Sequence, residues 1–326
     1  MKAWQVQELG EPEDVLRLVD VDEPSPGPEQ VRVAVEAVAL NFPDVLLCRG
    51  QYQERPPLPF TPGLEVAGTV VEAGASSGLV PGQRVLGGPA LPGGGLAEQV
   101  LLHRSSAFAI PDDMPSADAA AMLITYQTGY VGLHRRARLA PGETLLVHAG
   151  AGGVGSAAIQ LGRAAGARVI ATAGGPDKVE ICRRLGADLA VDYLTEDFVT
   201  AVKEATDGRG ADVVYDSVGG DVFDRSTKCV AFEGRLLVVG FAGGRIAEAR
   251  TNHLLVKNYS VVGLHWGLYR TMEPSLVEET HDALVTLYAR GAVKPLLSAE
   301  LPLAEAPAAL ARLSSRGTVG KVVLRP

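Results

Sequence analysis

Three glycines of this sequence have the spacing of a phosphate-binding turn. Gly150, Gly152 and Gly155 form the pattern G-x-G-x-x-G, which follows an apolar run at 144–147 and precedes a helical pattern at 154–165. In such a context the first glycine permits a tight turn, the second lets a pyrophosphate approach the backbone, and the third lets the helix pack closely on the strand. Free N–H groups and the helix dipole then attract the phosphates. The turn therefore predicts a dinucleotide site with phosphate contacts at Gly150, Gly152, Gly153, Val154 and Gly155. The alternative is a strand–helix turn that needs glycine for its shape alone.

The end of the next strand indicates which dinucleotide is bound. NAD-specific folds carry an acidic residue about 20 residues beyond the glycine motif, where it binds the ribose hydroxyls. Here the strand ends in Thr172-Ala173-Gly174-Gly175, with no acid. Nothing at the strand end would then repel a 2′-phosphate, which favours NADPH. Asp177 is close by, and we expect it to cap the helix that begins near residue 176.

Composition excludes several classes of protein. The chain has 326 residues, a net charge of −8 and 47% hydrophobic residues, which is typical of a globular protein of about two domains. An acidic chain is a poor partner for nucleic acid, since that binding depends on neutralising phosphates. There is no run of about 18 apolar residues and no signal-peptide pattern, so we expect a cytoplasmic location without a membrane span. The three cysteines lack the paired spacing of a disulfide framework or structural zinc site.

The chain divides into two patterns. Residues 1–118 contain short alternating or apolar stretches separated by proline and glycine, which predicts a β-barrel-like unit. Within it, the glycines at 93–95 are expected to form a surface loop. Helical composition extends from Ser116, a plausible N-cap, through Leu139.

Repeated strand–helix units follow the glycine turn. Apolar strands are expected at 144–147, 167–173, 189–193, 211–219, 234–240 and 259–265, with helices at 176–186, 195–206, 221–232 and 246–257. Such uniformly apolar strands predict a parallel sheet covered on both faces, and six of them fit an α/β, doubly wound dinucleotide fold. A helix at 274–290 and a strand at 320–324 are expected to return to the first domain.

Several motifs together resemble a known family. The segments AVALNFPDVLLCRGQY and LPFTPGLEVAGTVVEAG, the glycine turn and the ending GKVVL are similar to the medium-chain dehydrogenase/reductase superfamily, in particular its zinc-free, zeta-crystallin-like quinone oxidoreductases. The resemblance implies a GroES-like catalytic domain at 1–118 and 266–326 and a Rossmann domain at 119–265. It also implies NADPH as hydride donor and a homodimer formed through the strand at 259–265.

The positions of the family's zinc ligands differ in this chain. Zinc-dependent members carry a cysteine where Asn41 stands, and their Gly-His-Glu motif reads Gly63-Leu64-Glu65 here. Leucine cannot bind a metal and an amide oxygen is a poor zinc ligand, so no metal is expected. Cys48 lies off the ligand position and is interpreted as a small buried hydrophobe. Without a Lewis acid, the favoured substrate is already a good hydride acceptor, such as a quinone or conjugated enone.

The resemblance also implies positions for the cofactor and the substrate. By this resemblance, Gly174, Lys178 and Tyr193 contact the 2′-phosphate of NADPH. The contacts with adenine, ribose and nicotinamide are made by Ser217, Val239, Gly240 and Phe241. The resemblance places the nicotinamide carboxamide next to Gly263, Leu264 and His265. Asn41 and Tyr52 are implied beside the nicotinamide, with Thr128 near the ring, as the catalytic residues.

Each of these residues also has a purely structural interpretation. Lys178 is then a solvated helix charge and Tyr193 a half-buried strand end. Asn41 is a turn residue before proline, Tyr52 a loop aromatic, and Thr128 a helix residue bonded to its own backbone. His148 is interpreted as a core histidine, and Glu65 as structural.

The favoured function is an NADPH:quinone oxidoreductase that needs no metal and acts on a small molecule. The alternative within the same fold is an NADPH-dependent enoyl or alkenal reductase, which reduces a C=C bond. A cofactor-bound structural or nucleic-acid-binding protein is a third class, which the acidic composition disfavours.

Overall fold

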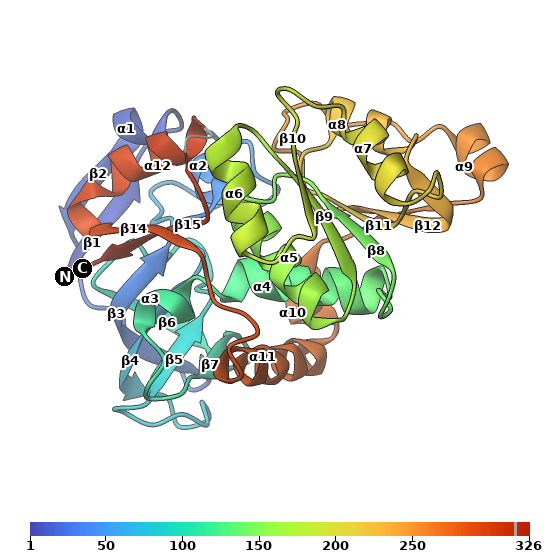
Figure 1. The fold of residues 1–326 in the computed structure, drawn as a ribbon. Helices are drawn as coiled ribbons and strands as arrows, with labels where there is room; N and C mark the ends of the chain where they lie inside the picture. The colour runs from blue at the N-terminus through green and yellow to red at the C-terminus, as the bar shows by residue number, and fades with distance from the viewer. Residues whose placement is uncertain (316–317) are drawn as a thin grey trace. The chain divides into compact units, whose positions relative to one another are not determined.

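The computed structural model describes residues 1–315 and 318–326, and its ribbon is shown in Figure 1. Contacts between residues divide the chain into two units. The first contains Met1–Ile124 and Pro295–Pro326, and the second contains Thr125–Lys294. No helix among the described residues has the length and apolar character needed to cross a membrane.

The first unit is built on a mainly antiparallel sheet with the strand order β14-β15-β3-β4-β5-β7, and β6 also pairs with β3. These strands are β3 (Gln30–Ala39), β4 (Val66–Ala73), β5 (Arg84–Gly87), β6 (Gln99–His103), β7 (Ala107–Ala109), β14 (Leu297–Pro302) and β15 (Lys321–Arg325). Along most of β3 alternate side chains are buried, because successive side chains of a strand point to opposite faces. A two-stranded sheet, β1 (Lys2–Val6) and β2 (Leu16–Asp20), and the short helices α1 (Pro12–Val15), α2 (Phe42–Cys48), α3 (Ser116–Ala120) and α12 (Ala306–Ser314) complete the unit. The predicted β-rich first unit is confirmed.

The second unit holds a parallel sheet of strand order β10-β9-β8-β11-β12-β13. The strands are β8 (Thr144–Val147), β9 (Arg168–Ala173), β10 (Leu189–Asp192), β11 (Ala211–Asp216), β12 (Val230–Val238) and β13 (Ser260–Gly263). This is the doubly wound order in which the chain direction along the sheet reverses at β8, so the loop after β8 lies where ligands bind in such folds. The predicted doubly wound parallel sheet is confirmed.

Helices α5 (Gly153–Ala164), α6 (Pro176–Arg184), α7 (Phe198–Ala205) and α8 (Gly220–Ser226) connect successive strands (Figure 1). Helix α9 (Thr251–Lys257) precedes β13, and α10 (Tyr269–Met272) and α11 (Pro274–Ala289) follow it. The predicted helix at 221–232 is shorter than expected, because β12 begins at Val230.

The continuous helix expected from 116 to 139 is interrupted. It consists of α3, α4 (Leu123–Tyr130) and a π-helical turn, Val131–Arg136. Near the start of α4, the N–H of Ile124 donates to Glu65 Oε2 at 2.7 Å. The first N–H groups of a helix lack a partner within it, and here the Glu65 carboxylate supplies one.

The boundaries between the two units lie at different positions in the sequence from those expected. The first division lies after Ile124 rather than after residue 118, and the second lies after Lys294 rather than after residue 265. Helix α11 therefore belongs to the second unit. The side chain of Gln160, on α5, holds the segment that follows α11: its Nε2 donates to Lys294 O at 3.0 Å and its Oε1 accepts from Lys294 N at 2.8 Å.

The expected surface loop at 93–95 is exposed only at Gly93. Gly94 and Gly95 are buried, and their N–H groups donate to Thr61 O at 2.9 Å and Gly63 O at 2.7 Å. A Cβ on Gly94 would lie 2.4 Å from Thr61 O, so glycine is needed for this close approach of two backbone segments.

Candidate active site

The glycine turn lies between the end of β8 and the start of α5. A Cβ on Gly155 would lie 2.2 Å from Ala149 O, and one on Gly150 would lie 2.8 Å from Cys182 Sγ. Both positions therefore require glycine for packing. Among the residues that the structure describes, a Cβ on Gly152 would meet only Ala149 O, at 3.3 Å, so the backbone at Gly152 is open to an approaching group.

The N-terminus of α5 offers free donors beside that open position. The first helical hydrogen bond to Gly152 is donated by Ser156, at 2.9 Å. The N–H groups of the first three residues of α5, which are Gly153, Val154 and Gly155, have no carbonyl one turn back within the helix. The turn thus combines free donors, the positive end of a helix dipole and an unobstructed glycine, which together suit a phosphate.

The end of β9 lies beside the end of β10. Tyr193 N donates to Ala173 O at 3.1 Å, and a Cβ on Gly174 would lie 2.6 Å from Tyr193 Oη. The phenol is half exposed (50%) and covers Gly174. Lys178 lies partly buried on the first turns of α6, and Asp177 is exposed at its first turn. Gly174, Lys178 and Tyr193 are therefore brought to the same edge of the sheet.

Asp192 is an acid at this edge that the sequence motif did not single out. Its Oδ1 accepts hydrogen bonds from Gly175 N at 2.9 Å and Leu194 N at 3.1 Å. The acid of NAD-specific folds is expected at the end of β9, the second strand of the sheet along the chain, whereas Asp192 ends β10, the third. Its hydrogen bonds hold the backbone of both loops.

The loops after β11 and β12 are joined to each other. Ala242 N donates to Ser217 O at 3.1 Å, and Gly243 N donates to Val218 O at 2.8 Å. A Cβ on Gly240 would lie 3.3 Å from Ser217 O. The predicted contacts Ser217, Val239, Gly240 and Phe241 therefore gather at the carboxyl end of the sheet, beside Gly263, Leu264 and His265, which follow β13.

Asp216, at the end of β11, was also missed. Its Oδ1 accepts from Val218 N at 2.8 Å and Gly219 N at 2.9 Å, which shapes the loop that carries Ser217. Its Oδ2 is buried and has no hydrogen-bond partner among the described residues. Burial raises the pKa of this carboxyl above its usual value, although the two N–H groups oppose the shift. An unpaired buried oxygen at the ligand-binding edge is a ready acceptor for a bound group.

Thr128 lies half-buried on α4. A Cβ on the next residue, Gly129, would lie 2.7 Å from Leu161 Cδ1, so α4 packs closely on α5. The π-helical turn after α4 touches the strand ends, since a Cβ on Gly132 would lie 3.0 Å from Leu264 Cδ2. Thr128 is thus on the helix that covers the glycine-turn helix.

Asn41, the first of the predicted catalytic residues, lies in a buried polar network of the first unit. Its Nδ2 donates to Ala39 O at 3.1 Å and to Glu65 Oε1 at 2.9 Å. Its Oδ1 accepts from Lys321 Nζ at 2.6 Å. All the hydrogen-bonding groups of this amide are therefore engaged within the protein.

Asp44 anchors the backbone around this network. Its Oδ2 accepts from Asn41 N at 2.8 Å, and its Oδ1 accepts from Gly63 N at 2.9 Å. Burial raises the pKa of this carboxyl to about 6, against the lowering effect of the two N–H groups and of Lys321. The network therefore fixes the start of α2 and the turn at Gly63, next to Leu64, which stands in place of a zinc-binding histidine.

Tyr52 lies in the loop after α2 and packs against the core of the first unit. Burial, and the carboxylates of Glu54 and Asp44, raise the pKa of its phenol. The hydroxyl therefore stays protonated at neutral pH and is a potential donor. Asn41 and Tyr52 belong to the first unit, whereas Thr128 belongs to the second.

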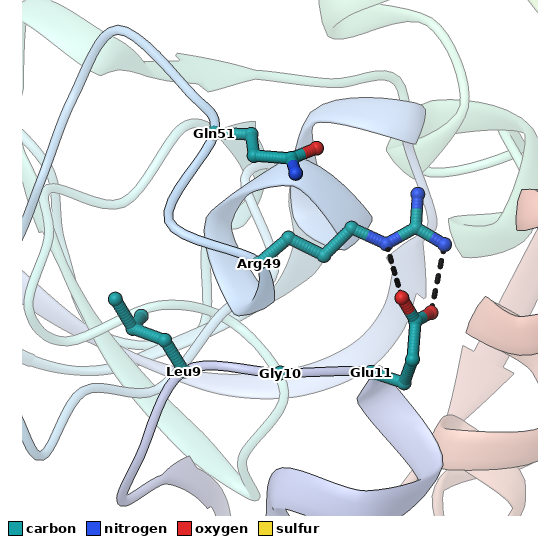
Figure 2. Close-up of a pocket in the computed structure, with 5 residues that line it drawn as sticks. All are labelled: Leu9, Gly10, Glu11, Arg49 and Gln51. Carbon is teal, nitrogen blue, oxygen red and sulfur yellow. Dashed lines mark hydrogen bonds and ion pairs between the residues drawn. The ribbon is translucent and has the colours of Figure 1, made fainter.

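A surface pocket of about 330 Å³ lies at the other end of α2 (Figure 2). Leu9, Gly10, Glu11, Arg49 and Gln51 line it. The Arg49 guanidinium binds Glu11 in two places, at 2.8 and 2.7 Å, and also donates to Ser314 Oγ at 2.7 Å. The two charged residues that line the pocket, Glu11 and Arg49, are thus paired with each other. None of the residues that line the pocket was predicted to be functional.

His148 is a core histidine, as predicted. Its ring nitrogens contact Thr172 Oγ1 at 3.0 Å and Ser226 Oγ at 2.8 Å. Because Ser226 donates its own proton to Val222 O, the Nε2 of His148 carries the hydrogen that Ser226 accepts. Burial lowers the pKa of the ring to about 3, so it is neutral at physiological pH.

The lysine of the network, Lys321, was missed as a functional candidate. It opens the final strand, in the motif GKVVL, which was used only to identify that strand. A charge at the start of an otherwise buried strand was the available signal, but its partners lie more than 250 residues away in sequence.

Comparison with known proteins agrees with this architecture. Residues 27–112 match the alcohol dehydrogenase GroES-like domain, and residues 153–282 match the zinc-binding dehydrogenase family. A quinone oxidoreductase-like protein 2 homolog from Nematostella vectensis is 43% identical over 301 residues, which cover 91% of this chain and 82% of the relative.

Solved structures are similar over the full length. The Escherichia coli quinone oxidoreductase complexed with NADPH is 30% identical, with a TM-score of 0.93 and all of both chains covered. A 2-haloacrylate reductase is also 30% identical, with a TM-score of 0.87, covering 100% of this chain and 99% of that one. With its GroES-like unit, its parallel-sheet Rossmann unit and these relatives, the chain belongs to the medium-chain dehydrogenase/reductase superfamily, among its quinone oxidoreductase-like members.

Proposed function

We propose that this protein is an NADPH:quinone oxidoreductase that transfers a hydride to a quinone without a metal. The single observation that carries the proposal is the glycine turn at the switch point of the parallel sheet, with Gly152 open and the acid-free end of β9 at the same edge. Similarity to quinone oxidoreductases, one of them solved with NADPH, supports the choice of substrate and cofactor.

The residues present fit NADPH. The N–H groups at the start of α5 would hold the pyrophosphate, and Gly174, Lys178 and Tyr193 would hold the 2′-phosphate. The loops at Ser217, Val239–Phe241 and Gly263–His265 would hold the remaining parts. At the start of the first of them, Asp216 Oδ2 offers an acceptor that has no partner within residues 1–315 and 318–326. When bound, NADPH supplies the hydride, so the protein's task is to position the acceptor and exclude water.

Asn41, Tyr52 and Thr128 are the proposed catalytic residues. The Tyr52 phenol, protonated at neutral pH, can donate a hydrogen bond to an acceptor oxygen. Asn41 can do so only by exchanging one of the hydrogen bonds that it donates to Ala39 and Glu65. Thr128 is proposed to bind the carboxamide.

Zinc does not fit at the family's metal position in this chain. Leu64 offers no donor atom, and the oxygens of Asn41 and Glu65 already bind the Lys321 ammonium at 2.6 Å. A metal ion on these oxygens would have to displace a buried ammonium that is hydrogen-bonded three times. This supports a metal-independent reaction with an acceptor that needs no Lewis acid.

A test is NADPH oxidation with a panel of quinones after removal of metals with a chelator. We expect turnover that a chelator does not reduce and that added Zn²⁺ does not raise. NADPH should give a higher kcat/KM than NADH. Lack of turnover with every quinone would refute the proposed substrate class.

The second candidate function is reduction of a C=C bond, favoured by the similarity to a 2-haloacrylate reductase. In this proposal the same cofactor and pocket would serve either reaction. Product analysis with a conjugated enal separates them, because a saturated aldehyde supports the second function.

The assembly is proposed to be a homodimer, and its location is proposed to be cytoplasmic. Strand β13 is the edge of the parallel sheet, paired only with β12 among the described residues. An uncovered strand edge is a liability in solution, and pairing with a second copy would remove it. Light scattering of the purified protein tests this.

A further inference from the structure

Lys321 is a buried lysine whose ammonium is surrounded by oxygen atoms. Its side chain is 5% exposed, and that of Glu65 is fully buried. Nζ donates to Leu40 O at 2.7 Å, Asn41 Oδ1 at 2.6 Å and Glu65 Oε1 at 2.6 Å. An ammonium has three hydrogens, so every donor is used.

This arrangement selects one orientation of the Asn41 amide. With Oδ1 facing the ammonium, Nδ2 must face Ala39 O and Glu65 Oε1. If the amide were reversed, its NH₂ group would face the ammonium, donor against donor, and Oδ1 would face two acceptors. Glu65 cannot move to compensate, because its Oε2 is held by Ile124 N at 2.7 Å.

We propose that Lys321 is a positioning residue that acts as a tethered cation: it fixes the Asn41 amide and the Glu65 carboxylate in the geometry that the reaction needs. The proposal rests on the proposed function, in which Asn41 lies beside the acceptor. A buried ion pair alone is weak grounds for a role, because apolar residues often replace such pairs without loss of stability. Here the third partner is the amide oxygen of a proposed catalytic residue, which an apolar replacement could not hold.

The first test is chemical rescue of Lys321→Ala. Truncation removes the ammonium and leaves three oxygens facing the space that it filled. We expect kcat with a quinone to fall by about 10²-fold, the scale of a misplaced catalytic group. Ethylammonium or propylammonium should restore kcat in a saturable manner, whereas tetramethylammonium, which has no N–H donor, should not at equal ionic strength.

The matched control is Val323→Ala, a fully buried residue of the same strand. It should lose stability, yet alkylammonium ions should leave its kcat unchanged, as for the wild type. Failure of primary amines to raise kcat of a folded Lys321→Ala protein would overturn the cation role.

A second variant covers the case in which Lys321→Ala does not fold. Lys321→Met with Glu65→Gln removes both buried charges and keeps similar volumes. We expect it to fold, as judged by circular dichroism and thermal unfolding, but to keep a low kcat. Wild-type kcat in this double variant would contradict the proposal.

A readout that does not depend on turnover separates this inference from the proposed function. In ¹H–¹⁵N spectra, the side-chain amide pair of Asn41, identified by its loss in Asn41→Ala, should shift in Lys321→Ala and return when ethylammonium is added. An unshifted amide pair would refute positioning, whatever the substrate. Absence of wild-type turnover with both quinones and enals would instead refute the proposed function.

Discussion

The ammonium of Lys321 and the carboxylate of Glu65 lie 2.6 Å apart, although 256 residues separate them in sequence. The pair joins the last strand of the chain to the turn before β4, and it also holds Asn41 and the start of α4. One buried contact therefore links the stability of the first unit to the geometry of its proposed catalytic residue.

Removal of one partner of this pair should destabilise the protein strongly. Lys321→Met leaves a buried carboxylate without its cation, which typically costs about 3–5 kcal/mol. The combined Lys321→Met and Glu65→Gln variant should recover most of that loss. Urea unfolding at pH 7 measures both, with the exposed Lys2→Met as control, since the Lys2–Asp20 pair lies at the surface and should contribute little to stability. Equal losses in the single and double variants would contradict the expected coupling.

Substitutions in the glycine turn should separate binding from folding. Gly155→Ala places a Cβ 2.2 Å from Ala149 O and should lower stability by about 1–3 kcal/mol. Gly152→Ala has one close neighbour among the described residues, Ala149 O at 3.3 Å, so it should lose less stability than Gly155→Ala while its methyl group obstructs the phosphate.

For Gly152→Ala we expect the Kd for NADPH to rise by about tenfold or more, a loss of about 1.4 kcal/mol. Fluorescence titration measures Kd, and thermal unfolding measures stability. Gly93→Ala is the matched control, since within the described ranges its Cβ would meet only Ala90 O, at 3.9 Å. A normal NADPH affinity in Gly152→Ala would show that the pyrophosphate binds elsewhere.

Charge at the end of β9 should set the preference between NADPH and NADH. Lys178→Ala removes a proposed partner of the 2′-phosphate, so the Kd for NADPH should rise by about tenfold while that for NADH changes little. Lys203→Ala, an exposed lysine on α7, is the control. Parallel losses for both cofactors would place Lys178 outside the 2′-phosphate site.

Acid should destabilise the second unit through His148. Burial lowers the pKa of the folded ring from 6.5 to about 3, so the unfolded chain binds the proton more readily. The contribution of His148 to stability is therefore complete above pH 6.5 and is lost as the pH falls from there toward 3. The slope should approach about 1.4 kcal/mol per pH unit.

Urea unfolding from pH 7 to pH 4 checks this expectation. His148→Gln should lose this part of the pH dependence as well as some stability, whereas His103→Gln, at an exposed position, should keep it. An identical acid profile in His148→Gln would assign the sensitivity to other groups.

Local sequence patterns predicted much of the fold. Apolar runs alternating with helices gave the parallel sheet, and the glycine spacing located the turn after β8, because both depend on residues close in sequence. Helix 116–139 was predicted as continuous, but α3 ends at Ala120 and α4 begins at Leu123, next to the N–H of Ile124 that donates to Glu65, about sixty residues away. Contacts between residues divide the chain after Lys294 rather than after residue 265, and the bonds between Gln160 and Lys294 join residues 134 apart.

The sequence by itself predicted the kind of site, because the glycines, the acid-free strand end and the residues at the expected zinc positions all lie in contiguous motifs. Only the tertiary structure decided what surrounds those residues. It placed Lys321 on the Asn41 amide and paired Asp192 with two backbone loops, and it left Asp216 Oδ2 without a hydrogen-bond partner in the part of the chain that is described. The physical reason is that a buried polar group is satisfied by whatever partner folding brings within about 3 Å, and that partner need not be near in sequence.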